Sequence, residues 1–192
     1  MSVTSQQQGM EAGLALPPQG TWKIDAAHST IGFTARHLMV SKVRGSFRDY
    51  TGAITIGPTP EESSVEITID APSVETRDAQ RDAHLRSSDF LDVERFPTLH
   101  FRSTSVRQTG PSTGTVTGDL TIRGVTRPVE LDVEFLGVVT DPWGGRRLGV
   151  VATGEIDREA FGLTWNMALE AGGVVVGRKV KLEIEAEAVL EA

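Results

Sequence analysis

Apolar and polar side chains alternate one by one along several separate segments of this chain. Val65, Ile67 and Ile69, for example, are separated by polar residues. Successive side chains of a β-strand point to opposite faces, so this spacing predicts half-buried strands. The same pattern gives four apolar faces: Ile31, Phe33, Ala35; Val65, Ile67, Ile69; Val129, Leu131, Val133, Phe135; and Val180, Leu182, Ile184, Ala186.

Short links containing Gly or Pro join the candidate strands. The predicted strands cover residues 21–25, 30–36, 43–56, 65–70, 98–106, 115–122, 129–135, 148–156 and 180–187. Gly124-Val125 predicts a tight hairpin, and Asp141–Gly145 predicts a more elaborate turn at a sheet end. The sequence therefore predicts an all-β protein with eight or more mostly antiparallel strands, arranged as a sandwich or a closed barrel.

One charged stretch, Thr76 to Ser88, departs from the alternating pattern. Ala79 and Ala83 lie four residues apart, and Thr76 and Asp78 are residue types that cap helices. We predict one short helix here. Its apolar stripe is too narrow to form a core, so the helix covers an edge or an opening, either as a structural plug or as a lid.

Length and composition fit one domain. The chain has 192 residues, of which 39% are hydrophobic, which is enough for a sizeable core. Residues 1–20 contain Pro17-Pro18 and neither a basic start nor a long apolar run, so we expect a flexible leader before a domain at 21–192. No segment approaches the roughly 20 apolar residues that cross a bilayer. The expected location is cytoplasmic.

Charge and residue types narrow the function. The net charge of −7 disfavours nucleic acid as a partner. The chain has no cysteine, and its four histidines form no His-Glu-x-x-His pair, so no metal site is predicted. Asp25-x-x-His28-Ser29 holds an acid, a base and a hydroxyl, but residues so close along an extended segment rarely form a triad. Turn hydrogen bonds explain Asp25 and His28 more simply, and no catalytic residue is assigned.

A series of motifs in a fixed order identifies a family. They are Trp22-x-x-Asp25-x-x-His28-Ser29-x-Ile31-x-Phe33, Val43-Arg44-Gly45-Ser46-Phe47 with Gly52, Thr76 to Leu85, Ser88-Asp89-Phe90-Leu91-Asp92, Phe96-Pro97-x-x-x-Phe101, Gly118-x-Leu120-Thr121-Ile122-Arg123-Gly124, and Ile156 to Leu163. Together they resemble the YceI-like family of isoprenoid-binding proteins over about residues 20–190. The resemblance implies an extended lipocalin-like β-barrel with one short helix.

The resemblance also implies a long apolar tunnel that holds a polyisoprenoid or the isoprenoid tail of a quinone. We expect its ligand-binding residues to be Ile31, Phe33, Ala35, His37, Val65, Ile67, Ile69, Phe101, Leu120, Ile122 and Phe161. Ordinary core packing is the alternative for each of them. Candidates for contact with a lipid headgroup are His28, Ser29, Arg36, His37, Asp82 and His84, while Arg158 suggests either a headgroup clamp or, as we expect, a strand-end salt bridge.

The function expected from this resemblance is binding, storage or transport of an isoprenoid lipid without catalysis. We expect that no cofactor is required and that the protein holds a bound isoprenoid lipid. A transient membrane contact and a homodimer are both compatible with such a protein. Two alternatives stay open: an enzyme that acts on an apolar substrate inside the barrel through a buried His or Asp, and a barrel that serves as a scaffold for protein interactions.

Overall fold

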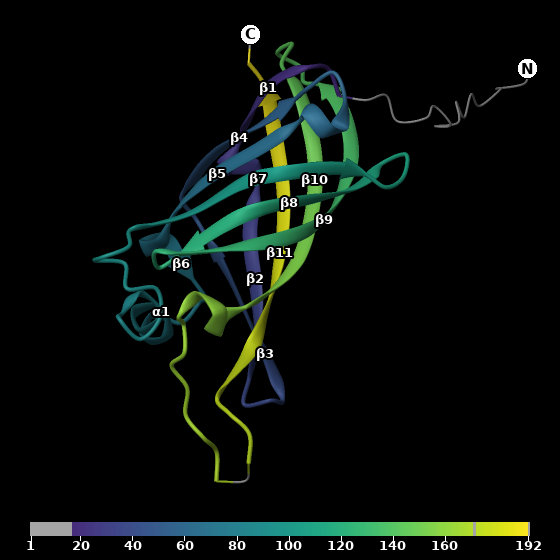
Figure 1. Ribbon diagram of the computed structural model, residues 1–192. Helices are drawn as coiled ribbons and strands as arrows, with labels where there is room; N and C mark the ends of the chain where they lie inside the picture. Colours follow the sequence, from purple (N-terminus) through teal and green to yellow (C-terminus); the bar gives the residue numbers. More distant parts are fainter. Residues whose placement is uncertain (1–16, 171, 192) are drawn as a thin grey trace, which may run out of the picture.

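The computed structural model describes residues 17–170 and 172–191. Most of the described residues lie in β-strands (Figure 1). The strands are β1 (Gly20–Ile24), β2 (Thr30–His37), β3 (Ser41–Phe47), β4 (Tyr50–Ile56), β5 (Ser64–Asp70), β6 (Val74–Glu75), β7 (Thr98–Gln108), β8 (Thr113–Ile122), β9 (Val125–Thr140), β10 (Arg146–Asp157) and β11 (Val176–Leu190). The helices are α1 (Ala79–Arg86) and the short 3-10 turns η1 (Ala26–His28), η2 (Pro60–Glu62), η3 (Ala71–Ser73) and η4 (Arg158–Phe161).

Eight antiparallel strands close into a barrel in the order β1-β4-β5-β7-β8-β9-β10-β11. The ring closes because β1 pairs with β11, with Trp22 opposite Leu190. Closure leaves no open edge in this ring. The predicted all-β antiparallel barrel of about eight strands with one short helix is confirmed.

The remaining three strands extend the sheet beyond the closed ring. Strand β2 pairs with β11 over Thr30–Glu185 to His37–Val176, below the short β1 contact, and β3 and β6 follow it. One long strand, β11, therefore carries both the closure and the extension on the same edge. The β2–β3 hairpin projects from the lower end of the molecule, beside the long loop that precedes β11 (Figure 1).

The predicted single strand over residues 43–56 is wrong, because the chain leaves the sheet at Arg48 and Asp49. The N–H of Arg48 donates to the carbonyl of Ser73 (3.2 Å), and the carbonyl of Asp49 accepts from the N–H of Asp70 (2.8 Å). Strand β3 then belongs to the extension and β4 to the closed ring. The apolar positions change parity across this corner, from Val43 and Phe47 to Tyr50, Ile54 and Ile56, so the sequence contained a signal that the single-strand prediction overlooked.

The predicted helix and both predicted turns are present. Helix α1 starts at Ala79, where the side chain of Asp78 accepts hydrogen bonds from two backbone N–H groups, as expected of a cap. Arg123 and Gly124 have φ of +51° and +73°, which forms the tight hairpin between β8 and β9. The side chain of Asp141 accepts from the backbone N–H groups of Trp143 and Gly145 in the turn before β10.

The described part of the chain contains no helix that is long and apolar enough to cross a membrane. The predicted leader comprises residues 1–20, of which residues 1–16 lie outside the described part of the chain. The leader and the domain at 21–192 stay predictions. Trp22, at the start of β1, is fully buried and its indole N–H donates to the carbonyl of Pro18 (3.0 Å).

Candidate functional site

Two apolar chambers lie one after the other inside the barrel. The first, which we call the helix-side chamber, has a volume of about 200 Å³ and extends to Leu85 of α1 and to Phe90 and Leu91. The second, the turn-side chamber, has a volume of about 340 Å³ and extends to the turns at residues 56–64 and 107–115. Four residues line both chambers: Ile67, Phe101, Leu131 and Ile184. These shared walls make the two chambers one divided tunnel.

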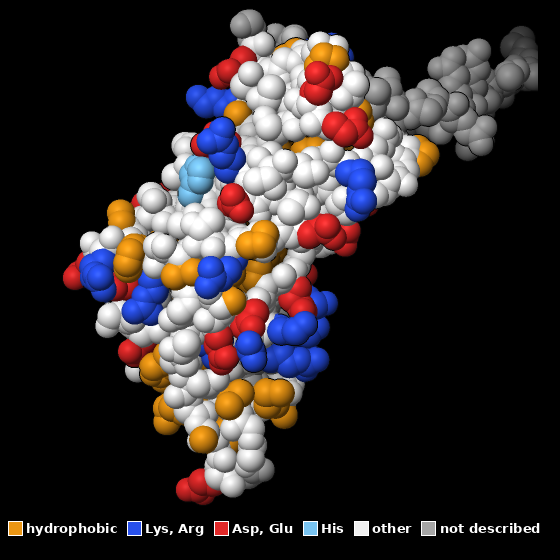
Figure 2. Space-filling view, in the orientation of Figure 1, with side chains coloured by type: hydrophobic (Ala, Val, Ile, Leu, Met, Phe, Trp, Pro, Cys, Tyr) orange, Lys and Arg blue, Asp and Glu red, His pale blue; other side chains and the backbone are white. Residues whose placement is uncertain are grey.

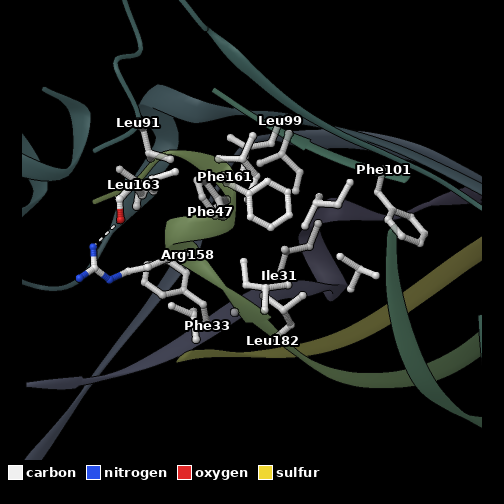
Figure 3. A pocket seen from close by; sticks show the side chains of 18 of the residues that line it. Ile31, Phe33, Phe47, Leu91, Leu99, Phe101, Arg158, Phe161, Leu163 and Leu182 are labelled. Carbon is white, nitrogen blue, oxygen red and sulfur yellow. Dashed lines mark hydrogen bonds between the residues drawn. The ribbon is translucent and has the colours of Figure 1, made fainter. Parts of the chain in front are cut away.

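Most of the predicted lining residues border this tunnel. The helix-side chamber is lined by nine of them, Ile31, Phe33, Ala35, Ile67, Ile69, Phe101, Leu120, Ile122 and Phe161, and the turn-side chamber adds Val65. His37 borders neither chamber. The role of all eleven as ligand contacts stays a prediction. Figure 3 shows the helix-side chamber, with Phe101 at one end of the view and Arg158 at the other.

Glycines hold two of the tunnel's aromatic rings against the barrel wall. Phe33 lies opposite Gly45 in the β2–β3 pair, and a Cβ added to Gly45 would lie 2.4 Å from the Phe33 ring. Gly118 pairs with Ser103, two residues after Phe101, and a Cβ added to Gly118 would lie 2.5 Å from the Phe101 ring. The missing side chains therefore leave each ring the space that it occupies against the neighbouring strand.

Several lining residues were missed by the sequence prediction. Leu131, Leu182 and Ile184 belong to apolar faces that the alternation had identified, so the pattern contained the signal. Leu91 lies in an irregular segment, where no periodicity indicates which way a side chain points. For Leu91, the family motif around Asp89 was the only signal in the sequence; its neighbour Phe90, which the same motif suggests as a barrel-facing residue, also lines the chamber.

Arg158 is the one charged residue that lines the helix-side chamber among those the structure describes, and it is only 4% exposed. Its Nε donates to the carbonyl of Gly177 (2.9 Å), its Nη2 to that of Val176 (3.3 Å), and its Nη1 to those of Leu163 and Trp165. It therefore ties together the two stems of the loop between η4 and β11. Burial lowers the pKa of the Arg158 guanidinium, opposed by the nearby acidic residues.

The strand-end salt bridge expected for Arg158 is made by a different arginine. Arg178 donates to the carboxylate of Asp157 (2.6 Å), and no carboxylate lies within ion-pair distance of Arg158 in the described part of the chain. The reason is the direction of the side chain: Arg158 begins η4 and turns inward, whereas Arg178 is exposed.

Apart from Arg158, the headgroup candidates named from the sequence do not line either chamber. The carboxylate of buried Asp82 accepts from the backbone N–H of Thr76 (2.8 Å), which fixes the start of the helix. His84 Nε2 lies 2.8 Å from the carboxylate of Asp89, and its ring packs against Phe90 and Trp165. Helix α1 is thus held to the barrel end by aromatic contacts.

Asp25 and His28 form the turn hydrogen bond that the sequence predicted, with 2.9 Å between His28 Nδ1 and Asp25 Oδ2. The hydroxyl of Ser29 donates to the carbonyl of Asp25 (2.7 Å), so it faces backbone and not the histidine. Asp25, His28 and Glu187 have donor atoms within 4.8 Å of one another. The guanidinium of Arg147 already donates to both carboxylates of this group.

Comparisons with known proteins agree with this architecture. A family profile described as YceI-like domain matches residues 22–188. A UPF0312 protein of Staphylococcus aureus strain N315 is 42% identical over 166 residues, which cover 85% of this chain and 94% of that protein. A UPF0312 protein of strain MW2 is 43% identical over the same length.

Three solved structures share the fold. A YceI protein of Campylobacter jejuni is 31% identical, with a TM-score of 0.71 over 82% of this chain and 90% of that chain. BcnA of Burkholderia cenocepacia has a TM-score of 0.73 at 21% identity, covering 86% and 99%. A polyisoprenoid binding domain from Saccharophagus degradans, implicated in plant cell wall breakdown, has a TM-score of 0.66 at 13% identity, covering 91% and 100%.

Proposed function

Since this chain belongs to the YceI-like family, we propose that it binds one isoprenoid lipid along its divided tunnel and stores or carries that lipid without chemical turnover. The observation that carries the proposal is the lining of the helix-side chamber, whose side chains are apolar except for Arg158. Pockets for small molecules commonly measure about 300–1,000 Å³ and have mostly apolar walls with few polar groups. The two chambers together fall in this range.

The lining supports binding better than catalysis. The one charged side chain in the helix-side chamber among the described residues is an arginine, which does not lose its proton in proteins and cannot serve as a general base. The donors of Arg158 are directed at backbone carbonyls. The histidines proposed as an alternative acid or base do not line the chambers.

The isoprenoid class is supported by family membership and by the Saccharophagus degradans domain that shares the fold. Burial of a methylene gains about 0.8 kcal/mol relative to water, so a chain of some forty carbons would nominally gain more than the practical ceiling of about 18–21 kcal/mol. A membrane interior offers the lipid an equally apolar environment. Selection among lipids must therefore come from length, shape and headgroup.

A substitution that fills the tunnel at its division tests the proposal. Ile67 lines both chambers, and Ile67→Trp should reduce the lipid recovered with the purified protein to a small fraction of the wild-type amount. Native mass spectrometry and mass spectrometry of extracted lipid measure the loss. Glu66→Trp is the matched control, because Glu66 immediately precedes Ile67 in β5 and is exposed to solvent.

Each result has a distinct meaning. An isoprenoid lipid found with the wild type and Glu66→Trp, but not with Ile67→Trp, supports the proposal. A wild-type protein that never contains lipid, or equal lipid in all three proteins, contradicts it. Chemical conversion of the recovered lipid by the wild-type protein would favour the enzyme alternative.

A further inference from the structure

Two loops at the lower end of the molecule present apolar side chains to solvent. Leu38, Met39 and Val40 form the β2–β3 turn and are 39%, 51% and 84% exposed, and Met167 in the loop before β11 is 58% exposed. The N–H of Leu38 donates to the carbonyl of Val175 (2.8 Å), so the two loops abut. Figure 2 shows hydrophobic side chains gathered at this end. We call these four residues the apolar tip.

The turn holds its two large apolar residues in an unfavourable backbone conformation. Leu38 and Met39 have φ of +50° and +61°, and the N–H of Val40 closes the turn onto the carbonyl of His37 (3.2 Å). Hairpin turns with two such residues strongly favour Asn-Gly, because a Cβ is strained in the left-handed region. Asn-Gly would also be more hydrophilic. Strain combined with exposure indicates a role for these side chains outside the fold.

Three cations lie on the β2–β3 hairpin next to the apolar tip, although the whole chain has a net charge of −7, and one exposed acidic residue, Glu170, lies in the neighbouring loop. Arg36 and Lys42 lie directly opposite each other across β2 and β3, and Arg44 follows on the same hairpin. All three are exposed, and in the described part of the structure none has a carboxylate within ion-pair distance. Like charges opposite each other destabilise a strand pair. Figure 2 shows basic side chains above the apolar end.

From this juxtaposition we propose that the apolar tip and its three cations dock onto the surface of a bilayer that contains anionic lipids. Apolar side chains enter the boundary between headgroups and acyl chains, while arginine and lysine meet the lipid phosphates. The inference rests on the proposed function, because it gives the tunnel a place to exchange lipid. Ala35 and Val176, which line the helix-side chamber, lie directly behind the tip.

Vesicle sedimentation tests the surface. The wild type should bind vesicles of phosphatidylcholine mixed with phosphatidylglycerol more strongly than vesicles of phosphatidylcholine alone. The double variant Leu38→Asn, Met39→Gly should lose most of this binding and melt at a higher temperature than the wild type, because it relieves strain at both positions. Arg36→Gln with Lys42→Gln should weaken binding to the anionic vesicles by roughly tenfold or more, since each cation near such a surface contributes appreciably.

Two further variants distinguish this surface from nonspecific adsorption of the protein to vesicles. Trp143→Ser removes an apolar side chain that is 87% exposed in the turn before β10, and it should leave vesicle binding unchanged. Val40→Ser, at the most exposed tip position, should weaken binding without altering the strained residues.

The proposal fails if the wild type does not bind anionic vesicles, if Leu38→Asn with Met39→Gly binds as the wild type does, or if Trp143→Ser abolishes binding. Lipid extraction from the same preparations keeps the two proposals distinct. If the protein contains isoprenoid lipid but does not bind vesicles, the docking surface is refuted and the proposed function is not affected. A protein that binds vesicles but never contains lipid refutes the proposed function.

Discussion

Each end of the barrel has its own arginine that joins neighbouring segments of the chain. The two arginines do so through different kinds of contact. Outside the turn-side chamber, Arg147 donates to the carboxylates of Asp25 (2.9 Å), Asp141 (2.8 Å) and Glu187. At the helix-side end, Arg158 donates to four backbone carbonyls and is buried.

The difference follows from where the two side chains point. Arg147 lies next to inward-facing Leu148 and so faces outward, where three acidic residues from separate elements converge on it. Arg158 faces the tunnel, where a carboxylate would add a second buried charge. Backbone carbonyls supply acceptors at no such cost, and the five N–H donors of arginine match them. The contacts of Arg147, which we call the outer tie, therefore depend on charge. Those of Arg158, the inner tie, depend on hydrogen-bond geometry.

The largest expected effect comes from the inner tie. Arg158→Met should lower the free energy of unfolding by about 3 kcal/mol or more, because each buried acceptor left unpaired costs about 1–3 kcal/mol. Urea denaturation measures the loss. Arg158→Lys keeps the charge but donates from a single point, so it should restore only part of the stability. Full stability in Arg158→Lys would show that charge, and not the fork of donors, matters here.

A smaller loss is expected from the outer tie. Arg147→Met leaves three carboxylates facing one another, but these are partly exposed and water can reach them. Salt should distinguish the two arginines. In concentrated salt the difference between wild type and Arg147→Met should shrink, because ion pairs near the surface are screened. The loss in Arg158→Met should stay nearly constant. An equal salt response in both variants would contradict the conclusion that Arg147 acts through charge and Arg158 through hydrogen-bond geometry.

Acid should weaken the outer tie alone, and this is the smallest effect. Hydrogen bonds from His28 and then Arg147 lower the pKa of Asp25, and those from Arg147 lower the pKa of Asp141. The folded state therefore binds fewer protons than the unfolded chain. This stability is present above the ordinary carboxyl pKa of 3.8 and is lost as pH falls below it.

Thermal melts from neutral pH down to about pH 3 measure this loss. The difference between wild type and Arg147→Met should narrow on acidification, because protonated carboxyl groups no longer repel one another or bind a cation. The difference between wild type and Arg158→Met should not follow the same titration. A constant difference for Arg147→Met across the range would contradict the assignment.

Local alternation in the sequence identified most of the side chains that face the tunnel along the regular strands, although His37, at the end of the alternating face of β2, borders neither chamber. Ile67 and Phe33 could be placed inside because a strand turns successive side chains to opposite faces, whatever its neighbours are. The tight β8–β9 hairpin followed in the same way from Gly124, which takes a positive φ without strain. Such features depend on a few consecutive residues.

Only the tertiary structure decided the features that need distant segments. The corner at Arg48 and Asp49 exists because β3 and β4 pair with different partners, and the division of the tunnel at Phe101 depends on walls from several strands. The sequence suggested a salt bridge for Arg158, and the folded chain instead brought Val176 and Gly177 beside it. Periodicity determines a face, whereas strand register and ring closure determine which groups meet across it.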